Sequence, residues 1–462
     1  MTTPLGTPDR PVRIAIVGAG PAGFYAAEAL LKNKAVTSMI DIFNHQPNPF
    51  GLVRDGVAPD HQSIKGVTRI YDGILANERV RYFGNVTLGT ELYHADLKAN
   101  YDQIIYAVGA QSDRRMGITG EDLVGSYPAT AFVAWYNGHI DYSDRVFDLS
   151  HPRAVVIGNG NVAMDVTRIL VRAVSELATT DMADHALAAL RTSGVREVIV
   201  LGRRGPAQAA FTNAEIKEFG ELPGVEVIID ADDLQLDPLS EASLAANKIA
   251  VKNMDTMRGF AARERTHAER RIVLRFFASP VEILGADGRV VGVKVERNAL
   301  IADGRGGLKA QGTGEYDVIE CGLVLRSVGY RSIPLEGVPF DEKAALIPNV
   351  AGRVTAGAGG VVIAGEYVVG WAKRGPSGVI GTNKPDSVAT VASMVEDLAM
   401  LPDAGAPDAQ VVVDLLAARG ARPVSYSDWK RIDAVEQLRG GAQGRPRVKI
   451  ISLAEMLAIV NS

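Results

Sequence analysis

Cysteine is nearly absent from this sequence: the chain of 462 residues contains a single one, Cys321. One thiol cannot form an internal disulfide, a redox-active C-x-x-C pair, a cysteine-based iron–sulfur site or a cysteine-rich zinc site. If the protein handles electrons, we therefore expect it to do so with a bound organic cofactor rather than with a metal centre.

The sequence also lacks an excess of positive charge and a long uninterrupted apolar run. Asp and Glu number 54 against 49 Lys and Arg, a balance that argues against a dedicated nucleic-acid-binding protein. The most apolar stretch, residues 14–31, contains Pro21, Glu28 and three glycines, which are unfavourable in a membrane span and unlike a signal peptide. We therefore expect no membrane segment, and we expect a cytoplasmic location.

Two glycine-rich turns are the most informative motifs that are present. Each follows a short apolar run, at 13–17 and 154–157, and each precedes a predicted helix. In a G-x-G-x-x-G/A turn the first glycine permits the tight turn, the second lets the backbone approach a pyrophosphate, and the third position lets the helix pack on the strand. The residues concerned are Gly18, Gly20 and Gly23 in the first turn and Gly158, Gly160 and Ala163 in the second. Two such turns in a chain about three times the usual domain length predict two dinucleotide-binding domains of Rossmann type and α/β class.

The residues after the second unit's next strand distinguish between nucleotides. An NAD site usually has Asp or Glu there, to bind the ribose hydroxyl. Here Arg203 and Arg204 follow the strand 198–201, and paired guanidinium groups bind a phosphate well. NADP is therefore favoured, with an extra helix expected between Gly158 and Arg203 because their separation exceeds the usual one of about 20 residues. FAD is the natural candidate for the first turn, since a nicotinamide and a flavin form a hydride-transfer pair.

Other stretches carry weaker predictions. Apolar spacing predicts a helix over 62–76, and the helix after the second turn is expected to run to about Glu176. We expect short strands at 272–277, 281–284, 290–297 and 448–451, a turn-rich loop at 303–314 and a linker at 402–409.

Several long motifs, in order along the chain, resemble those of a known family. They are Pro-Asn-Pro-Phe-Gly-Leu-Val-Arg-Asp-Gly-Val-Ala-Pro-Asp-His at 47–61, Tyr-Ala-Val-Gly-Ala at 106–110, Gly-Asn-Gly-Asn-Val-Ala-Met-Asp at 158–165, Arg-Arg-Gly-Pro at 203–206 with Ala-Phe-Thr at 210–212, and Gly-Trp-Ala-Lys-Arg-Gly-Pro-Ser-Gly-Val-Ile-Gly-Thr-Asn at 370–383. In these motifs the chain closely resembles the bacterial adrenodoxin reductase-like ferredoxin–NADP⁺ reductases.

The resemblance implies a flavoenzyme in which one domain is inserted into the other. The FAD domain would comprise residues 1–111 and 332–462, and the NADP domain would comprise residues 112–331. Electrons would pass from NADPH through FAD to a ferredoxin-type iron–sulfur protein, with the flavin accepting a hydride and releasing single electrons.

The resemblance also implies roles for individual residues. Those expected to contact FAD are Gly18, Gly20, Ala22, Gly23, Leu52, Val86, Trp371, Gly378, Val379 and Ile380. Those expected to contact NADP are Arg114, Asn159, Gly160, Asn161, Val162, Arg203, Arg204, Glu215 and Gly378. His61 and Glu218 match polar positions near the flavin–nicotinamide junction, where they are candidates for a catalytic role, and no metal site is expected.

Two positions depart from the family's pattern. The family commonly has Glu at the end of the first unit's second strand, for the adenosine ribose of FAD, and this chain has Asn44. Asn can bind a hydroxyl without charge assistance, so we expect weaker binding of FAD. The segment 355–363 resembles a small insertion before the flavin loop.

The electron acceptor has one indication in the sequence. Basic residues outnumber acidic ones over 251–275, with Lys252, Arg258, Arg263, Arg265, Arg270, Arg271 and Arg275 against Asp255, Glu264 and Glu269. An acidic ferredoxin would be attracted to a basic surface, although a solvated helix face gives the same pattern.

Three other functions are alternatives to a ferredoxin reductase. An NADPH:quinone or dye oxidoreductase without a protein partner fits the same motifs. A disulfide reductase of the thioredoxin reductase type needs a dithiol, which a chain with only Cys321 cannot supply. A nucleotide-sensing flavoprotein without catalysis is disfavoured by the intact flavin-loop motif and the arginine pair.

Overall fold

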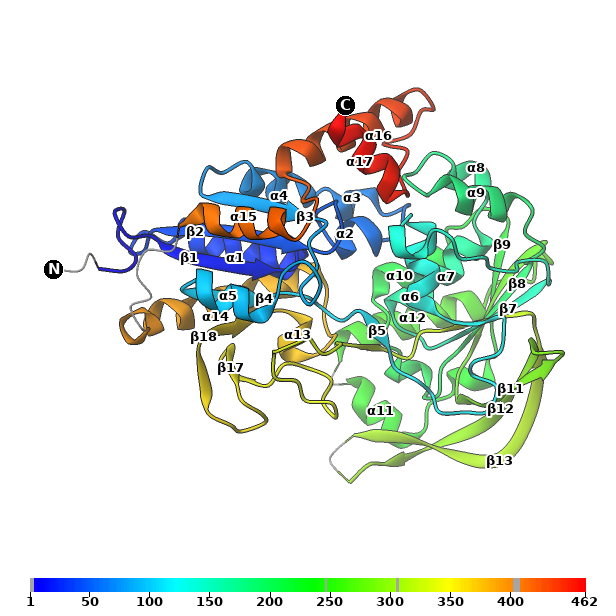
Figure 1. The fold of residues 1–462 in the computed structure, drawn as a ribbon. Helices are drawn as coiled ribbons and strands as arrows, with labels where there is room; N and C mark the ends of the chain where they lie inside the picture. The colour runs from blue at the N-terminus through cyan, green and yellow to red at the C-terminus, as the bar shows by residue number, and fades with distance from the viewer. Residues whose placement is uncertain (1–3, 246, 305–306, 402–407) are drawn as a thin grey trace.

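The computed structural model describes residues 4–245, 247–304, 307–401 and 408–462, so residues 402–407 of the predicted linker lie outside it. The main chain forms two lobes side by side (Figure 1), each built around a mainly parallel sheet. The first lobe combines the blue N-terminal part of the chain with yellow and orange segments near its C-terminus, and the second is formed by the cyan to yellow-green middle. The predicted α/β class with two Rossmann-like units is confirmed.

The first sheet brings together strands from both ends of the chain. In spatial order these are β16 (Asn349–Val350), β17 (Arg353–Thr355), β18 (Val362–Val368), β4 (Gln103–Tyr106), β1 (Val12–Val17), β2 (Ser38–Asn44) and β3 (Val80–Gly84). Every residue of β1 is buried, as expected for a parallel strand with helices on both faces. One face is covered by α1 (Pro21–Lys32), α4 (Thr68–Leu75), α14 (Asn383–Glu396) and α16 (Tyr426–Gly441), and the other by α5 (His94–Asn100) and α15 (Ala409–Ala418).

The second sheet contains only strands from the middle of the chain. Its order is β6 (Ser126–Pro128), β14 (Leu323–Arg326), β7 (Arg153–Ile157), β8 (Glu197–Leu201), β10 (Arg270–Arg275) and β9 (Val225–Ile229). One face packs on α6 (Ala129–Tyr136), α7 (Asn161–Val171), α9 (Asp184–Arg191), α10 (Asn213–Phe219) and α12 (Lys248–Ala261). The other face packs on an antiparallel sheet of β11 (Ala278–Ala286), β12 (Arg289–Ala302) and β13 (Leu308–Glu320).

A short antiparallel ribbon joins the two lobes. It pairs β5 (Ser112–Asp113) with β15 (Tyr330–Arg331), where the chain enters and leaves the middle segment. The remaining helices are α2 (Leu52–Asp55), α3 (Gln62–Lys65), α8 (Val174–Leu177), α11 (Pro238–Ala245), α13 (Trp371–Arg374) and α17 (Leu453–Asn461), with the 3₁₀ turns η1 (Ile140–Tyr142), η2 (Pro206–Gln208), η3 (Asp232–Leu234), η4 (Ile380–Thr382) and η5 (Asp397–Met400).

The prediction of one helix over 62–76 is wrong in one respect, because the segment forms two helices, α3 and α4, that are separated at Gly66. There the amides of Gly66 and Val67 bond to carbonyls three residues back, which tightens the turn. The helix expected to reach Glu176 ends at Val171, because Arg172 adopts an extended conformation. The extra helix expected before Arg203 is present as α9.

Two predictions beyond 300 are also corrected. Most of the loop predicted at 303–314 is strand, because residues from Leu308 onward pair with β12. The strand predicted at 448–451 is extended but joins no sheet among the described residues. Instead, the amides of Val448 and Ile450 bond to the carbonyl and carboxylate oxygens of Glu436. The segment 355–363 forms the turn between β17 and β18.

Within the described ranges, none of the helices combines the length and the apolar character that crossing a bilayer requires. The cytoplasmic location expected from the sequence stays a prediction.

Candidate nucleotide-binding sites and their junction

The first glycine-rich turn has the geometry of a loop that holds a pyrophosphate. Gly18 has a φ of +110°, and a Cβ there would lie 2.5 Å from the carbonyl oxygen of Ala107. A Cβ on Gly23 would lie 2.4 Å from the carbonyl oxygen of Gly18, so α1 packs directly on the turn. Beside Gly20, by contrast, no described atom lies within 4 Å of a Cβ, and no side chain caps α1 there. The open space and the helix N-terminus fit a phosphate group.

The second turn repeats this arrangement at the start of α7. Gly158 has a φ of +119°, and a Cβ there would lie 2.2 Å from the carbonyl oxygen of Ser327. A Cβ on Gly160 would meet no described atom within 4 Å, and no side chain caps the helix. The sequence signal therefore produced the same cradle twice, once in each lobe.

Asn44 holds the first turn in place at the end of β2. Its Oδ1 accepts a hydrogen bond from the amide of Ala19 at 3.2 Å, and its Nδ2 donates to the carbonyls of Gln46 and Asn48 at 3.0 and 2.9 Å. Both amide protons are therefore already used within the protein. Only Oδ1 can still accept a further hydrogen bond. In the predicted contact with FAD, a ribose hydroxyl would therefore have to donate to Asn44.

Other residues predicted for the FAD site lie near this turn or support it. Ala22 is buried in the first turn of α1, and a Cβ on Gly370 would approach its Cβ to 2.6 Å. Val86 is buried, and its amide donates to the carbonyl of Asn44 at 3.0 Å. Leu52, at the start of α2, is exposed and can contact a ligand without rearrangement.

The predicted flavin loop lies beside the connecting ribbon. The ring of Trp371 lies 5.2 Å from that of Tyr330 on β15, and its Nε1 donates to the carbonyl of Ser377. Gly378 has a φ of +81°, and Val379 is exposed. Ile380 begins η4 and packs against the core of the first lobe.

The residues after Gly158 are anchored by the segment before α10. Asn161 Oδ1 accepts from the amide of Thr212 at 2.9 Å, and the carbonyl of Asn159 accepts from Ala210. Val162 packs on the core of the second lobe. These contacts explain why the Ala-Phe-Thr motif accompanies the glycine-rich turn although the two are far apart in sequence.

Arg203 and Arg204 follow β8 without a counter-charge. In the part of the chain that the structure describes, neither guanidinium has an ion-pair or hydrogen-bond partner. Burial and the charge of Arg203 lower the pKa of Arg204 from its ordinary value, yet an arginine stays charged at neutral pH. Two adjacent, unpaired guanidinium groups at a strand end fit the 2′-phosphate of NADP.

Arg114 lies on the connecting ribbon, apart from this pair. Its Nε donates to the carbonyl of Tyr330 at 3.4 Å. Arg114 lines a cavity of about 740 Å³ beside β5 and β15. Arg145, Arg326 and Lys343 also line this cavity. The cavity is basic, in keeping with the anionic ligand expected at Arg114.

His61 and Glu218 meet where the two lobes come together. His61 Nε2 lies 2.9 Å from Glu218 Oε2, although the residues are 157 positions apart. His61 Nδ1 lies 3.8 Å from Asp165 Oδ1 on α7. The structure therefore brings together the two residues predicted for the junction.

Arg168 is the centre of this junction, and its guanidinium is fully buried. It contacts the carboxylates of Asp60 at 2.7 Å, Asp165 at 2.7 Å, and Glu215 and Glu218 at 3.2 Å. Asp60 belongs to the loop before α3, whereas the other carboxylates lie on α7 and α10. Arg168 therefore fastens the first lobe's loop to the second lobe.

The carboxylates around Arg168 differ in acidity. Burial would raise the pKa of Asp60, but its hydrogen bonds to Arg168 lower it to about 2. Burial and the charge of Asp165 raise the pKa of Glu215 to about 7. Burial likewise raises the pKa of Asp165. At neutral pH, the cluster can thus hold a proton beside His61.

Asp60, Asp165 and Arg168 were not among the residues predicted for this site from the sequence. Ligand atoms of His61, Asp165 and Glu215 lie within 4.8 Å of one another, but Arg168 already provides a cation to both carboxylates. The sequence does contain one indication of Asp165 and Arg168. They are three residues apart in the predicted helix just after the glycine-rich turn, and this spacing places both on one face of that helix.

Comparisons with known proteins agree with this arrangement. A family model described as pyridine nucleotide-disulphide oxidoreductase matches residues 12–218. The chain is 47% identical over 461 residues to NADPH-ferredoxin reductase FprA of Mycobacterium tuberculosis, covering 97% of this chain and 99% of that one. It is 40% identical to the mitochondrial NADPH:adrenodoxin oxidoreductase of Arabidopsis thaliana, covering 97% and 95%. The solved structure of M. tuberculosis FprA with NADPH superposes with a TM-score of 0.92 at 46% identity, covering 98% of this chain and 100% of that one.

Proposed function

The chain belongs to the family of NADPH-dependent ferredoxin and adrenodoxin reductases, and from this premise we propose that it passes electrons from NADPH through FAD to a ferredoxin-type iron–sulfur protein. The observation that carries the proposal is the pair of open glycine cradles, one in each lobe, with His61 and Glu218 in contact where the lobes meet. The family model's reference to disulphides does not extend to a dithiol here, because Cys321 is the only cysteine and is buried.

Both nucleotides fit the residues present. The cradle at Gly20 fits the pyrophosphate of FAD, and the cradle at Gly160 fits that of NADPH. The unpaired Arg203 and Arg204 then select the 2′-phosphate. The chemistry that FAD supplies when bound is the conversion between two-electron hydride transfer and single-electron transfer.

The protein's own residues orient the reactants and hold a proton. Trp371 offers an aromatic face beside Tyr330. His61 and Glu218, which contact each other where the lobes meet, would hold the nicotinamide amide, while Glu215, with its pKa near 7, holds a proton in the same cluster. Arg168 holds the carboxylates of Glu215 and Glu218 close together through an ion pair to each. Orientation of this kind accounts for much of a hydride-transfer rate.

Anaerobic mixing of the purified holoprotein with NADPH tests the proposal. Bleaching of the flavin absorbance, followed by reduction of a ferredoxin faster than of a quinone, is the expected result. No bleaching would refute it, and preference for quinone would favour an oxidoreductase without a protein partner.

Replacing His61 and Glu218 separately with Gln tests their roles. We expect the rate constant of flavin reduction to fall about tenfold in each, since a misplaced nicotinamide lowers the rate. Unchanged rate constants and unchanged NADP affinity in both variants would refute those roles.

The domain division at 111/112 and 331/332 is part of the proposal. It is supported by sheet membership, because the described strands of the first sheet lie outside 112–331 and those of the second lie inside. It is also supported by the β5–β15 ribbon, whose two strands lie immediately inside the two proposed boundaries and pair with each other there.

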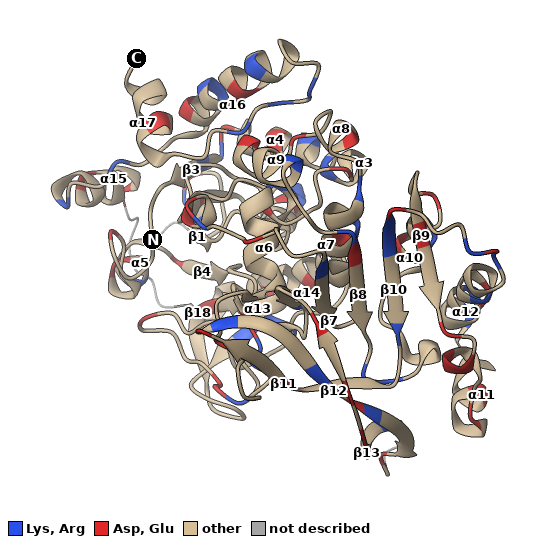
Figure 2. Ribbon diagram, turned by 90° about the vertical axis from the view of Figure 1, so that its right-hand side faces the viewer, with Lys and Arg blue, Asp and Glu red and all other residues tan. Residues whose placement is uncertain are grey.

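An acidic partner is proposed to dock on α12 and the neighbouring α10. Not all of the seven basic residues of 251–275 are free of acidic partners, because Arg271 on β10 pairs with Glu197 and Arg265 pairs with Glu226. Lys252 and Arg258 on α12 are exposed and have no ion pair among the described residues. Figure 2 shows α12 on the outside of the second lobe with basic positions along it. An acidic partner placed there would lie close to α10, which carries Glu218.

Charge removal tests this docking surface. Lys252→Gln with Arg258→Gln is expected to raise the KM for an acidic ferredoxin several-fold and to flatten its salt dependence, because steering by exposed charge is screened by salt. Dye reduction should be unchanged. Arg271→Gln, from the same sequence segment but paired with Glu197, is the control. Equal effects of both changes would contradict the proposal.

A further inference from the structure

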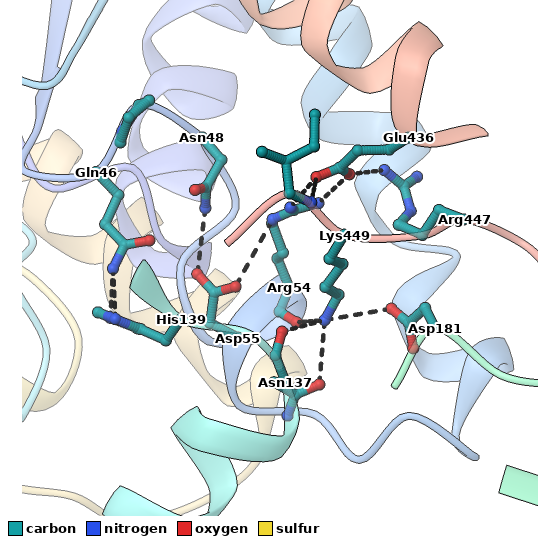
Figure 3. A network of polar contacts seen from close by, with 12 residues as sticks. Gln46, Asn48, Arg54, Asp55, Asn137, His139, Asp181, Glu436, Arg447 and Lys449 are labelled. Atoms are coloured by element: carbon teal, nitrogen blue, oxygen red, sulfur yellow. Dashed lines mark hydrogen bonds and ion pairs between the residues drawn. The ribbon is translucent and has the colours of Figure 1, made fainter. Parts of the chain in front are cut away.

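The segment 445–451, here called the bridge segment, crosses from one lobe to the other. Its attachment to the first lobe runs through α16. Arg447 pairs with Asp433 and Glu436, and Glu436 also pairs with Arg54 at 2.6 Å. Figure 3 shows Glu436 between Arg54 and Arg447. Because Glu436 is fully buried, this end of the segment is held firmly in the first lobe.

The other contacts of the bridge segment are with the second lobe. Arg445 Nε donates to the carbonyl of Thr180 at 2.9 Å, and its Nη1 pairs with Asp184 at 2.5 Å. Ser143 Oγ donates to the carbonyl of Ile451 at 3.3 Å. A Cβ on Gly138 would lie 2.9 Å from the Ile451 side chain. The segment therefore packs against both the end of α6 and the turn before α9.

Lys449 joins the two sets of contacts at a single atom. Its Nζ donates to the carbonyl of Arg54 at 2.9 Å, on the short helix α2 that precedes His61, and to the carbonyl of Asn137 at 2.8 Å, immediately after α6. It also lies 3.4 Å from Asp181, which Lys65 holds at 2.8 Å. The side chain of Lys449 has no exposed area, and Figure 3 shows it pointing into the space between these groups.

A buried ammonium group in this position is costly unless every donor is used. Burial lowers the pKa of Lys449 to about 7, while the charge of Asp181 opposes that effect. The charges of Asp181 and Asp55 favour the charged form of Lys449, whereas those of Lys65 and Arg54 disfavour it. The hydrogen-bond partners of Lys449 lie on both lobes. If the lobes shifted, the buried ammonium group would lose some of these partners, which costs free energy.

We propose that Lys449 is a positioning residue for hydride transfer, which fixes the loop carrying His61 against the lobe carrying Glu218. The inference rests on the proposed function. Arg54 lies on α2, which leads into the loop carrying His61, and Asn137 follows α6, which packs on α7. Holding Arg54 and Asn137 on one nitrogen therefore sets the separation of the two nucleotide cradles. A displacement of about 1 Å in such an arrangement can lower a rate about 100-fold.

Lys449→Met tests the proposal, because methionine keeps most of the volume and removes the donors. At saturating NADPH we expect the flavin of this variant to be reduced at least about tenfold more slowly, with FAD content and NADP⁺ affinity unchanged. Amide hydrogen exchange should accelerate at residues 137–143 and 180–184. Arg439→Met is the control, since Arg439 on α16 pairs with Glu455 within the first lobe and lies outside the bridge segment. It should leave both the rate and the exchange near those of the wild type.

Asp181→Asn provides a second variant from the opposite lobe if Lys449→Met fails to fold. It should slow flavin reduction in the same way, and the double variant should be little slower than either single one. The proposal is overturned if Lys449→Met and Asp181→Asn reduce flavin at the wild-type rate, or if Arg439→Met slows it equally. Failure of the wild type to bleach with NADPH would instead refute the proposed function, while the hydrogen-exchange result would still report whether Lys449 joins the lobes.

Discussion

Glu215→Gln is expected to stabilise the protein at pH 8 and to have little effect near pH 4.5. Burial and the charge of Asp165 raise the pKa of Glu215 from 4.5 to about 7. Between these values the folded protein binds more protons at this site than the unfolded chain does. The stability of the wild type therefore falls as pH rises through this window, and above pH 7 the full cost is present. A glutamine at position 215 carries no ionisable group, so this contribution to the pH dependence of stability is removed.

The magnitude follows from the same pKa. At 1.36 kcal/mol per unit, the cost of the ionised carboxylate at pH 8 is at most about 3 kcal/mol. Glutamine still accepts a hydrogen bond from Arg168, but without charge assistance, which removes about 1 kcal/mol of the gain. We therefore expect a net stabilisation of about 1–2 kcal/mol at pH 8.

Urea unfolding of the FAD-loaded variant and wild type at pH 5 and pH 8, at one FAD concentration, measures this difference. Glu221→Gln is the control, because Glu221 lies just after α10, is exposed and has no ion pair in the described part of the chain. A gain that is equal at both pH values, or larger at pH 5, would show that Glu215 is not held at an elevated pKa and would refute the reasoning.

Three further predictions follow from the cradles, the arginine pair and the thiol. Gly20→Ala should fold normally but lose FAD, because a Cβ there meets only the space left for a pyrophosphate, whereas Gly23→Ala should destabilise the fold itself through its 2.4 Å approach to a carbonyl oxygen; FAD content and the unfolding midpoint distinguish them. Arg203→Ala with Arg204→Ala should raise the KM for NADPH about 10–100-fold and leave that for NADH nearly unchanged, since hydrogen bonds to a phosphate are charge-assisted; equal losses for both nucleotides would contradict the assignment. Cys321 should resist thiol reagents in the native protein and react after unfolding, because burial raises its pKa to about 12; rapid labelling of the folded protein would be the contrary result.

The glycine cradles and the arginine pair were predictable because their signals are local. Gly18 and Gly158 must adopt positive φ to begin the turn, and few other residues do so readily. Arg203 could be assigned because it follows a strand whose end faces the ligand in this fold. Each of these features depends on neighbours within one βαβ unit.

In two segments, distant packing decided what a local pattern could not. The basic residues of 251–275 look alike in the sequence, but Arg271 on the internal strand β10 pairs with Glu197, whereas Arg258 on α12 is exposed with no ion pair among the described residues. The strand predicted at 448–451 has the apolar character of a β-strand, yet Glu436 takes up its amides before any neighbouring strand can. Composition does not reveal such competition.

The sequence by itself indicated two nucleotide-binding units, predicted NADP for the second of them, and excluded a dithiol mechanism through its single cysteine. Only the tertiary structure decided how the units face each other. Asp60 meets Arg168 across 108 positions, and Lys449 meets the carbonyl of Arg54 across 395. The reason is physical: turn and helix signals arise from sterics between near neighbours, whereas a buried ion pair between distant residues exists only after both lobes have folded and excluded water from the space between them.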